Sequence, residues 1–321
     1  MKTLSDLVEV SQSFDSGKVD FNVPSNTITH SDGKMNVPMT LPNGEIVGYE
    51  QIDFEPLALQ HTSKLLGIPY NYLVTCPKDV QSYNMAYWQS TLGRSGRKSP
   101  EWLVRGYRST PADTLRARAV LTGEYAPYMN TQMLQVVSNY IGDHNVELVR
   151  PYVDRDSLYV KIQVSNTQDG NYATGVVVKH GEIGNYQISV APFVQRHSCT
   201  NSVVWLAGGW VHRHRWASLA WLEASIMEHV GHALKMTGVL HENMIRSASV
   251  HIPKFADVVR AVCKDNGFSQ VVTDTVLMGS EGQGTRQGLV NGLSFAAHRA
   301  NVEQDVTVRL EELAGQVLMA R

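Results

Sequence analysis

The six residues Tyr159-Val160-Lys161-Ile162-Gln163-Val164 place Val or Ile at every second position. A period of two puts alternate side chains on opposite faces of an extended chain. The stretch therefore predicts a β-strand with one face turned to an apolar core.

Other short segments of the middle of the chain are similarly rich in Val, Ile, Leu and Tyr. They predict strands at residues 102–107, 116–121, 146–153, 174–179 and 187–194, with a further short strand at 45–49. Apolar spacing and Gly or Pro stop signals predict helices at 55–75, 79–92, 130–141, 216–236, 253–266, 285–300 and 304–320. Strands gathered in the middle with helices at the ends favour an α+β fold, a central, mostly antiparallel sheet covered by helices, with a helical C-terminal part.

Three regions follow from this pattern. Residues 1–55, rich in Ser, Asn, Asp, Gly and Pro, predict an irregular N-terminal arm. Residues 56–215 predict the α+β core, in which 93–100 form a basic, glycine-containing, flexible loop. Residues 216–321 predict a helical region packed on that core.

Composition excludes several classes of protein. Of the 321 residues 43% are hydrophobic and 18% charged, which is enough apolar material for a core. No stretch is apolar over the length that a membrane span needs, and the first residues lack the apolar segment of a secretory signal. Three widely spaced cysteines argue against a disulfide framework. We expect a cytoplasmic protein of the host cell, with no membrane partner.

Charge is distributed in blocks. Residues 1–60 carry three basic and nine acidic side chains, whereas 94–118 carry seven basic and two acidic ones, and 179–216 carry four and one. Aromatic residues are interleaved with the basic ones, which is the composition of surfaces that bind single-stranded nucleic acid. The predicted phosphate contacts are Arg94, Arg97, Lys98, Arg105, Arg108, Arg116, Arg118, Arg196, Arg213 and Arg215. The predicted stacking residues are Trp102, Tyr107 and Trp210.

Catalytic motifs are weak or absent in the sequence. The glycine-rich stretch 279–288 lacks the Gly-Lys-Ser/Thr of an NTPase, and Thr285 there predicts an ordinary helix N-cap. The Cys199 and His197 pair is best explained by a packed, structural cysteine. A metal-dependent enzyme stays as an alternative, with ligands from the set His212, His214, His229, His232 and His241.

Five stretches in this order resemble a family carried by phages and plasmids, described as a phage/plasmid-like domain of unknown function. They are residues 66–73 (Leu-Gly-Ile-Pro-Tyr-Asn-Tyr-Leu), 102–107, 118–130, 190–201, and the run from 284–291 to 309–315. The resemblance implies a replication, recombination or host-takeover context and brings no catalytic residues. One departure is the apolar run 203–210, where more Arg or Lys would be expected.

The sequence thus predicts a non-enzymatic protein of a phage or plasmid that binds or anneals single-stranded DNA, or RNA, in recombination or replication. Its outline is similar to that of the single-strand annealing superfamily, whose phage members commonly act as homo-oligomers, and we therefore expect this chain to form a homo-oligomer. No catalytic residue, metal ligand or cofactor is predicted. A second alternative is an interaction protein acting on a host system, with an acidic arm (Asp6, Glu9, Asp15, Asp20) that mimics nucleic acid or docks on a basic partner.

Overall fold

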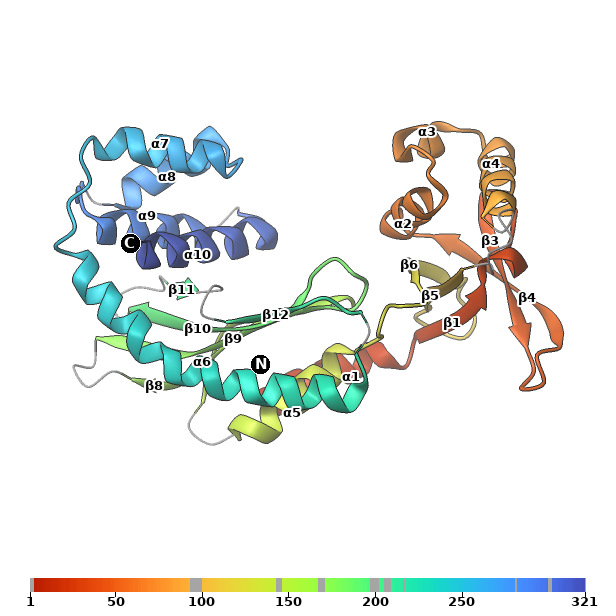
Figure 1. Ribbon diagram of the computed structural model, residues 1–321, viewed down its shortest axis with the longest axis horizontal. Helices are drawn as coiled ribbons and strands as arrows, with labels where there is room; N and C mark the ends of the chain where they lie inside the picture. Colours follow the sequence, from red (N-terminus) through yellow and green to blue (C-terminus); the bar gives the residue numbers. More distant parts are fainter. Residues whose placement is uncertain are drawn as a thin grey trace.

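Two β-sheets organise the chain into a small and a large lobe, which lie side by side (Figure 1). The computed structural model describes residues 3–92, 100–142, 146–166, 171–196, 202–204, 209–215, 217–280, 282–299 and 302–320. Within those residues each sheet has six strands, and the strands are mostly antiparallel. The predicted α+β class is confirmed.

The small lobe is built on a sheet of strand order β1-β5-β6-β4-β3-β2, with helices on one face. Its core brings together Val37, Ile52, Leu66, Met85 and Trp102, from the sheet and from the three helices α2 to α4 or their ends. Its elements are β1 (Lys18–Pro24), the 3-10 turn η1 (Ser25–Thr27), β2 (Thr29–Ser31), β3 (Lys34–Thr40), β4 (Ile46–Phe54), α2 (Pro56–Leu66), α3 (Tyr70–Thr75), α4 (Lys78–Thr91), β5 (Glu101–Tyr107) and β6 (Arg116–Thr122).

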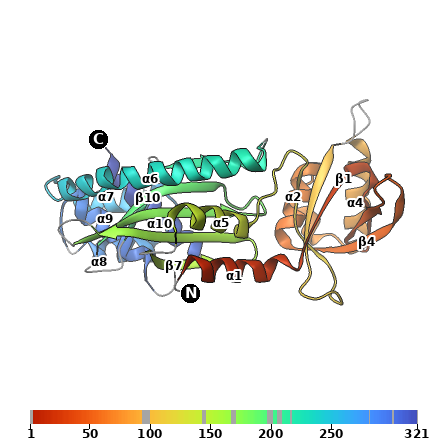
Figure 2. The same cartoon turned by 90° about the horizontal axis from the view of Figure 1, so that it is seen from below.

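The large lobe has three layers, with the sheet β11-β10-β9-β8-β7 in the middle and β12 paired to β10 (Figures 1 and 2). Val160 and Ile162 pack toward α1, α5 and α6, whereas Tyr159 packs toward α10, as the period of two predicts. The elements are α1 (Leu4–Asp15), α5 (Asn130–Ile141), β7 (Glu147–Val153), β8 (Ser157–Asn166), β9 (Tyr172–Gly181), β10 (Ile188–Arg196), β11 (Ser202–Val204), β12 (Trp210–His212), α6 (Leu219–Ser247), α7 (Phe255–Asp265), α8 (Gln270–Gly279), α9 (Arg286–Ala297) and α10 (Gln304–Met319).

The prediction of an irregular arm over residues 1–55 is wrong. This region forms α1 and the strands β1 to β4. The side chain of Thr3 caps α1 by accepting a hydrogen bond from the Asp6 backbone at 3.1 Å, and Leu4 and Leu7 bury the first turns in the large-lobe core. The region therefore supplies a helix to one lobe and four strands to the other, and the predicted core 56–215 spans both sheets.

The other predicted elements differ from the observed ones mainly in length. Helix α5 begins and ends where it was predicted, and Thr285 caps α9 by accepting from the Gly288 backbone at 3.1 Å. Helix α6 runs on to Ser247, and α8 was not predicted. Across the part of the chain that the structure describes, no helix is both long enough and apolar enough to cross a bilayer.

Candidate nucleic-acid interface

Two arginines of the predicted interface, Arg105 and Arg118, lie in the interior. Both side chains are 0% exposed. Arg105 binds Asp20 at 3.0 Å, and Arg118 binds Asp156 at 2.6 Å and Glu182 at 3.4 Å. Neither guanidinium can reach a phosphate in solvent, so the prediction is wrong for both. A buried cation is retained because a carboxylate of the same chain neutralises it.

The carboxylate of Glu182 is the centre of this buried cluster. One of its oxygens accepts from the Lys18 ammonium and from the Asn130 backbone, each at 2.7 Å, and the other faces Arg118. Lys18 and Arg118 belong to small-lobe strands, whereas Glu182 follows β9 of the large lobe. The cluster therefore joins the two lobes. It also takes the acidic residues Asp15 and Asp20 out of the proposed acidic docking arm.

Two of the three predicted stacking residues use their rings in packing within the protein. Trp102 is 1% exposed in the small-lobe core. Two histidine rings stack on Trp210, that of His212 at a centroid distance of 5.6 Å and that of His229 at 4.8 Å. The prediction is wrong for Trp102, because its ring is buried in the core; Trp210 is only partly buried, and its role in stacking stays a prediction. Tyr107 is half-buried, with the Arg155 guanidinium 4.9 Å from its ring centroid.

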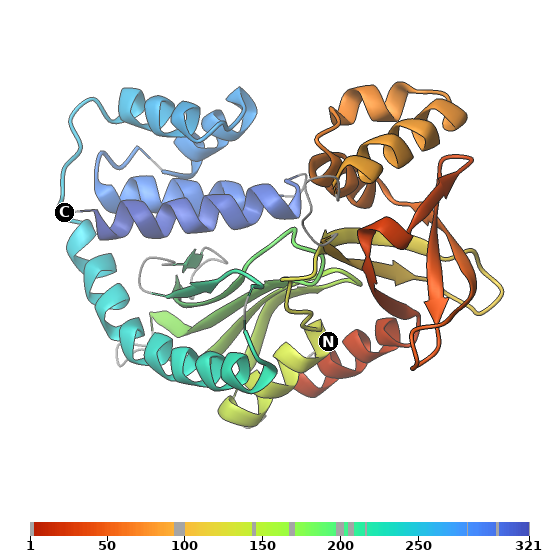
Figure 3. The same cartoon turned by 45° about the vertical axis from the view of Figure 1, so that its right-hand side comes forward.

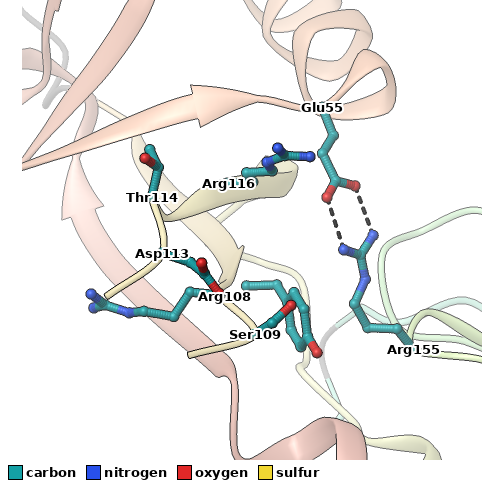
Figure 4. Close-up of a pocket in the computed structure, with 8 residues that line it drawn as sticks. Glu55, Arg108, Ser109, Asp113, Thr114, Arg116 and Arg155 are labelled. Carbon is teal, nitrogen blue, oxygen red and sulfur yellow. Dashed lines mark hydrogen bonds and ion pairs between the residues drawn. The ribbon is translucent and has the colours of Figure 1, made fainter. Parts of the chain in front are cut away.

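A cavity of about 420 Å³, here called the Arg116 pocket, lies between the β5–β6 hairpin, the start of α2 and the β7–β8 turn (Figure 4). It collects two predicted arginines and one that was not predicted. Its lining residues are Glu55, Tyr107, Arg108, Ser109, Asp113, Thr114, Arg116 and Arg155.

The cations of the Arg116 pocket differ in how far they are neutralised. Arg155 forms two hydrogen bonds with Glu55, at 2.8 and 2.7 Å, and also binds Asp156. Burial opposes its charge, but these carboxylates outweigh burial and raise the pKa of Arg155. In Figure 4 the Arg108 guanidinium points away from Arg155, and it lies 3.6 Å from Glu50. Arg116 is exposed and has no ion-pair partner within the described ranges.

A second cavity of about 320 Å³, the Arg213 pocket, contains two further exposed arginines of the prediction, Arg213 and Arg215. It is lined by Leu121, Tyr125, Gly184, Tyr186, Gln187, Arg213, His214 and Arg215. No carboxylate is among these residues, and burial lowers the pKa of His214 to about 4, so that this ring is neutral at pH 7. The pocket carries two positive charges beside two tyrosine rings.

The two pockets open at opposite ends of β6. Ala117 and Val120 both pack in the small-lobe core although they are three residues apart, because the pairing with β5 shifts by one residue between them. Their outer neighbours Arg116 and Leu121 therefore lie on the same face of the sheet. The distance between them is roughly 15 Å at the rise of a bulged strand.

Arg196 does not belong with these residues. It ends β10, eight residues beyond Ile188, which is roughly 26 Å at the rise of an extended strand, whereas the Arg213 pocket lies at the beginning of β10. The predicted contacts Arg94, Arg97 and Lys98 lie outside the described residues, as do His197 and Cys199.

The histidines of the metal hypothesis lie apart. His212 and His229 stack on Trp210, His214 lies beside His180 with ring centroids 4.9 Å apart, and His241 contacts Tyr172. His232 is exposed on α6. Among the residues that the structure describes, no group of three or more His, Cys, Asp or Glu side chains could hold a metal ion.

No pattern in the sequence pointed to Arg155, Tyr125 or Tyr186 as residues of the site. Arg155 stands between Asp154 and Asp156, so a search for basic blocks passes over it. Tyr125 lies outside the basic segments, in the loop after β6, and Tyr186 lies in the turn after β9, within the segment 179–216 but away from its arginines in the sequence. A search for single arginines in tight turns would have found Arg155.

Comparison with protein families, with curated proteins and with solved structures finds no match to this chain. The resemblance to the phage and plasmid family therefore stays a prediction.

Proposed function

We propose that the protein binds single-stranded nucleic acid at the junction of its lobes, with the sugar–phosphate backbone at the Arg116 pocket and the Arg213 pocket. The observation that carries the proposal is the position of Arg116, Arg213 and Arg215. All three are exposed, and none has an ion-pair partner in the described part of the chain. Guanidinium groups in this state are available to phosphate oxygens, to which they donate two parallel hydrogen bonds.

The spacing of the pockets fits an extended polyanion better than a small ligand. A stacked single strand covers roughly 15 Å with about five nucleotides, and more where it passes around the junction. Tyr125 and Tyr186 border the Arg213 pocket. The Tyr125 ring already stacks on His214 at a centroid distance of 4.8 Å, so Tyr186 is the ring that the proposal assigns to a base, and tyrosine stacks on bases without reading their sequence. The proposal therefore requires contacts at both ends of β6.

The test is the affinity for a fluorescein-labelled 15-mer of thymidine, measured by anisotropy from 50 to 200 mM salt. Single-strand binding loses about 0.7 in the slope of log K against log salt for each phosphate contact removed. The double variant Arg213→Ala/Arg215→Ala should bind more weakly, with a slope lower by about 1.4.

The matched control is Arg246→Ala/Arg260→Ala, which removes the same charge from exposed positions on α6 and α7. This control should bind as the unmodified protein does. Absence of salt-sensitive binding by the unmodified protein at micromolar concentration would exclude the proposal. Equal loss in both double variants would assign the effect to net charge and exclude a site at the Arg213 pocket. An unlabelled duplex of the same length, added as competitor, should displace the oligonucleotide less well than a single strand does.

A further inference from the structure

Helix α4 buries polar side chains and exposes aromatic ones, the reverse of an ordinary surface helix. Its buried residues are Gln81, Ser82, Met85 and Gln89. The Gln89 amide donates to the backbone oxygens of Ser25 and Ile28, which anchors the helix on the turn before β2. The polar face therefore holds α4 in place inside the small lobe through hydrogen bonds.

Other polar side chains on the buried face of α4 also form hydrogen bonds. The Ser82 hydroxyl accepts from the Gly33 backbone at 2.8 Å, and the Gln81 amide donates to the Leu73 backbone oxygen at 2.9 Å. Because these bonds fix the rotation of α4 about its axis, the helix cannot turn its aromatic residues inward.

The aromatic residues of α4 and α3 form one exposed patch, here called the α4 patch: Tyr72, Tyr83, Tyr87 and Trp88. Their exposures are 50%, 70%, 47% and 45% respectively. The Tyr83 and Tyr87 rings are nearly parallel, with a centroid distance of 6.4 Å, and Trp88 meets Tyr87 edge-on at 5.7 Å. The Asn84 amide donates to the Tyr72 hydroxyl at 3.1 Å, which ties α3 to α4. The helices of the small lobe, drawn in orange, lie together on one side of that lobe (Figure 3). Contiguous exposed aromatic surface marks a binding site in proteins.

We infer that the α4 patch stacks on the bases of a single-stranded nucleic acid; this inference rests on the proposed function and adds a second contact surface to it. Base stacking requires exposed aromatic rings, and the four rings of the patch outnumber the two exposed aliphatic side chains of the same helices, Val74 and Val80. In the sequence three cations, Arg94, Arg97 and Lys98, follow Thr91 within seven residues, and the first carboxylate after Thr91 is that of Glu101. An aromatic surface with three cations following it in the sequence complements a strand of bases on a phosphate backbone, whereas a second copy of the chain would carry the same positive charges.

The experiment uses the labelled 15-mer with the double variant Tyr83→Ala/Tyr87→Ala. Loss of a stacked aromatic ring weakens single-strand binding, and the two together should raise the Kd at least about tenfold. The salt slope should stay unchanged, since no phosphate contact is removed. Tyr83→Phe/Tyr87→Phe keeps the ring faces and should keep the affinity. Tyr49→Ala/Tyr140→Ala, which removes two comparably exposed tyrosines elsewhere, should also keep it.

The outcomes separate this inference from the proposed function. If the unmodified protein binds and the alanine variant binds equally well, the inference is wrong and the proposed function stands. If the unmodified protein does not bind, the proposed function is wrong, and the inference that rests on it is wrong as well. Light scattering on the same samples decides between partners: a variant that becomes smaller in solution than the unmodified protein would assign the α4 patch to contacts between copies and overturn the inference.

Discussion

Replacing Glu182 by Gln should separate the charge of the lobe junction from its shape. The carboxylate is 0% exposed and accepts from the Lys18 ammonium, the Asn130 backbone and the Arg118 guanidinium. Glutamine keeps the size and one acceptor oxygen of the glutamate. Its NH2 group, however, is itself a donor and would face the donor groups that the second carboxylate oxygen accepts from. Breaking a buried ion pair from one side costs about 3–5 kcal/mol.

The expected loss lies at the lower end of that range. Lys18 retains Asp15 at 2.7 Å and Arg118 retains Asp156 at 2.6 Å, so that neither cation is left without a carboxylate. We therefore expect a loss of about 3 kcal/mol. At an unfolding entropy of about 2.1 cal/mol/K per residue, this loss lowers the Tm of a chain of 321 residues by roughly 4–5 °C.

The measurement is calorimetric melting at pH 7 and low salt, with Glu242→Gln as control. Glu242 pairs with Arg246 on the exposed face of α6 at 3.3 Å, and such pairs contribute less than about 1 kcal/mol. A Tm for Glu182→Gln within 1 °C of that of the control would refute the reasoning, because it would mean that the buried carboxylate does not stabilise the junction.

Three further results are expected. Burial lowers the pKa of His214 from 6.5 to about 4, so between these pH values the unfolded chain binds a proton at this ring and the folded chain does not. The free energy of unfolding should therefore be full above pH 6.5 and fall by about 3 kcal/mol toward pH 4. Urea unfolding should show a smaller dependence on pH in His214→Gln, and a dependence of opposite sign would contradict the assignment. Gln89→Leu should destabilise the protein by about 2 kcal/mol or more, because two backbone oxygens lose their donor, and a neutral effect in urea unfolding would show that α4 is held otherwise. Gly175→Ala should destabilise strongly and lower the soluble yield, since a Cβ there would clash with the Ile162 oxygen in the neighbouring strand. Gly238→Ala, on α6 with open space around it and no positive φ, is the control and should stay folded.

The elements that were predicted correctly are those whose local sequence signals are sufficient to specify them. Helix α5 has an apolar stripe and a Gly at its end, and β8 alternates with period two, so that each needs little from the rest of the chain. Helix α1 was missed although Thr3 and Asp6 form a capping box, because its apolar residues are few and its core lies in the distant large lobe. Helix α4 was located correctly, yet its buried face was not foreseeable, because amides occupy the inner positions.

The candidate site was predicted in part, and the failures share one cause. Arg116, Arg213 and Arg215 line pockets, as exposed arginines of basic segments would. Arg105 and Arg118 come from the same segments but are neutralised by Asp20, 85 residues earlier, and Glu182, 64 residues later. A count of charges along the chain cannot distinguish the two groups, because the partner that neutralises a cation is chosen by the pairing of distant strands.

By itself, the amino-acid sequence determined that this chain forms an α+β fold and where most of its strands and helices lie, because hydrophobic period and capping residues act within one or two turns. The tertiary structure alone decided that there are two sheets, that the acidic N-terminal segment neutralises part of the basic one, and that α4 turns its tyrosines outward. The physical reason is that burial and ion pairing depend on contacts between residues far apart in the chain, and those contacts exist only once the lobes have packed together.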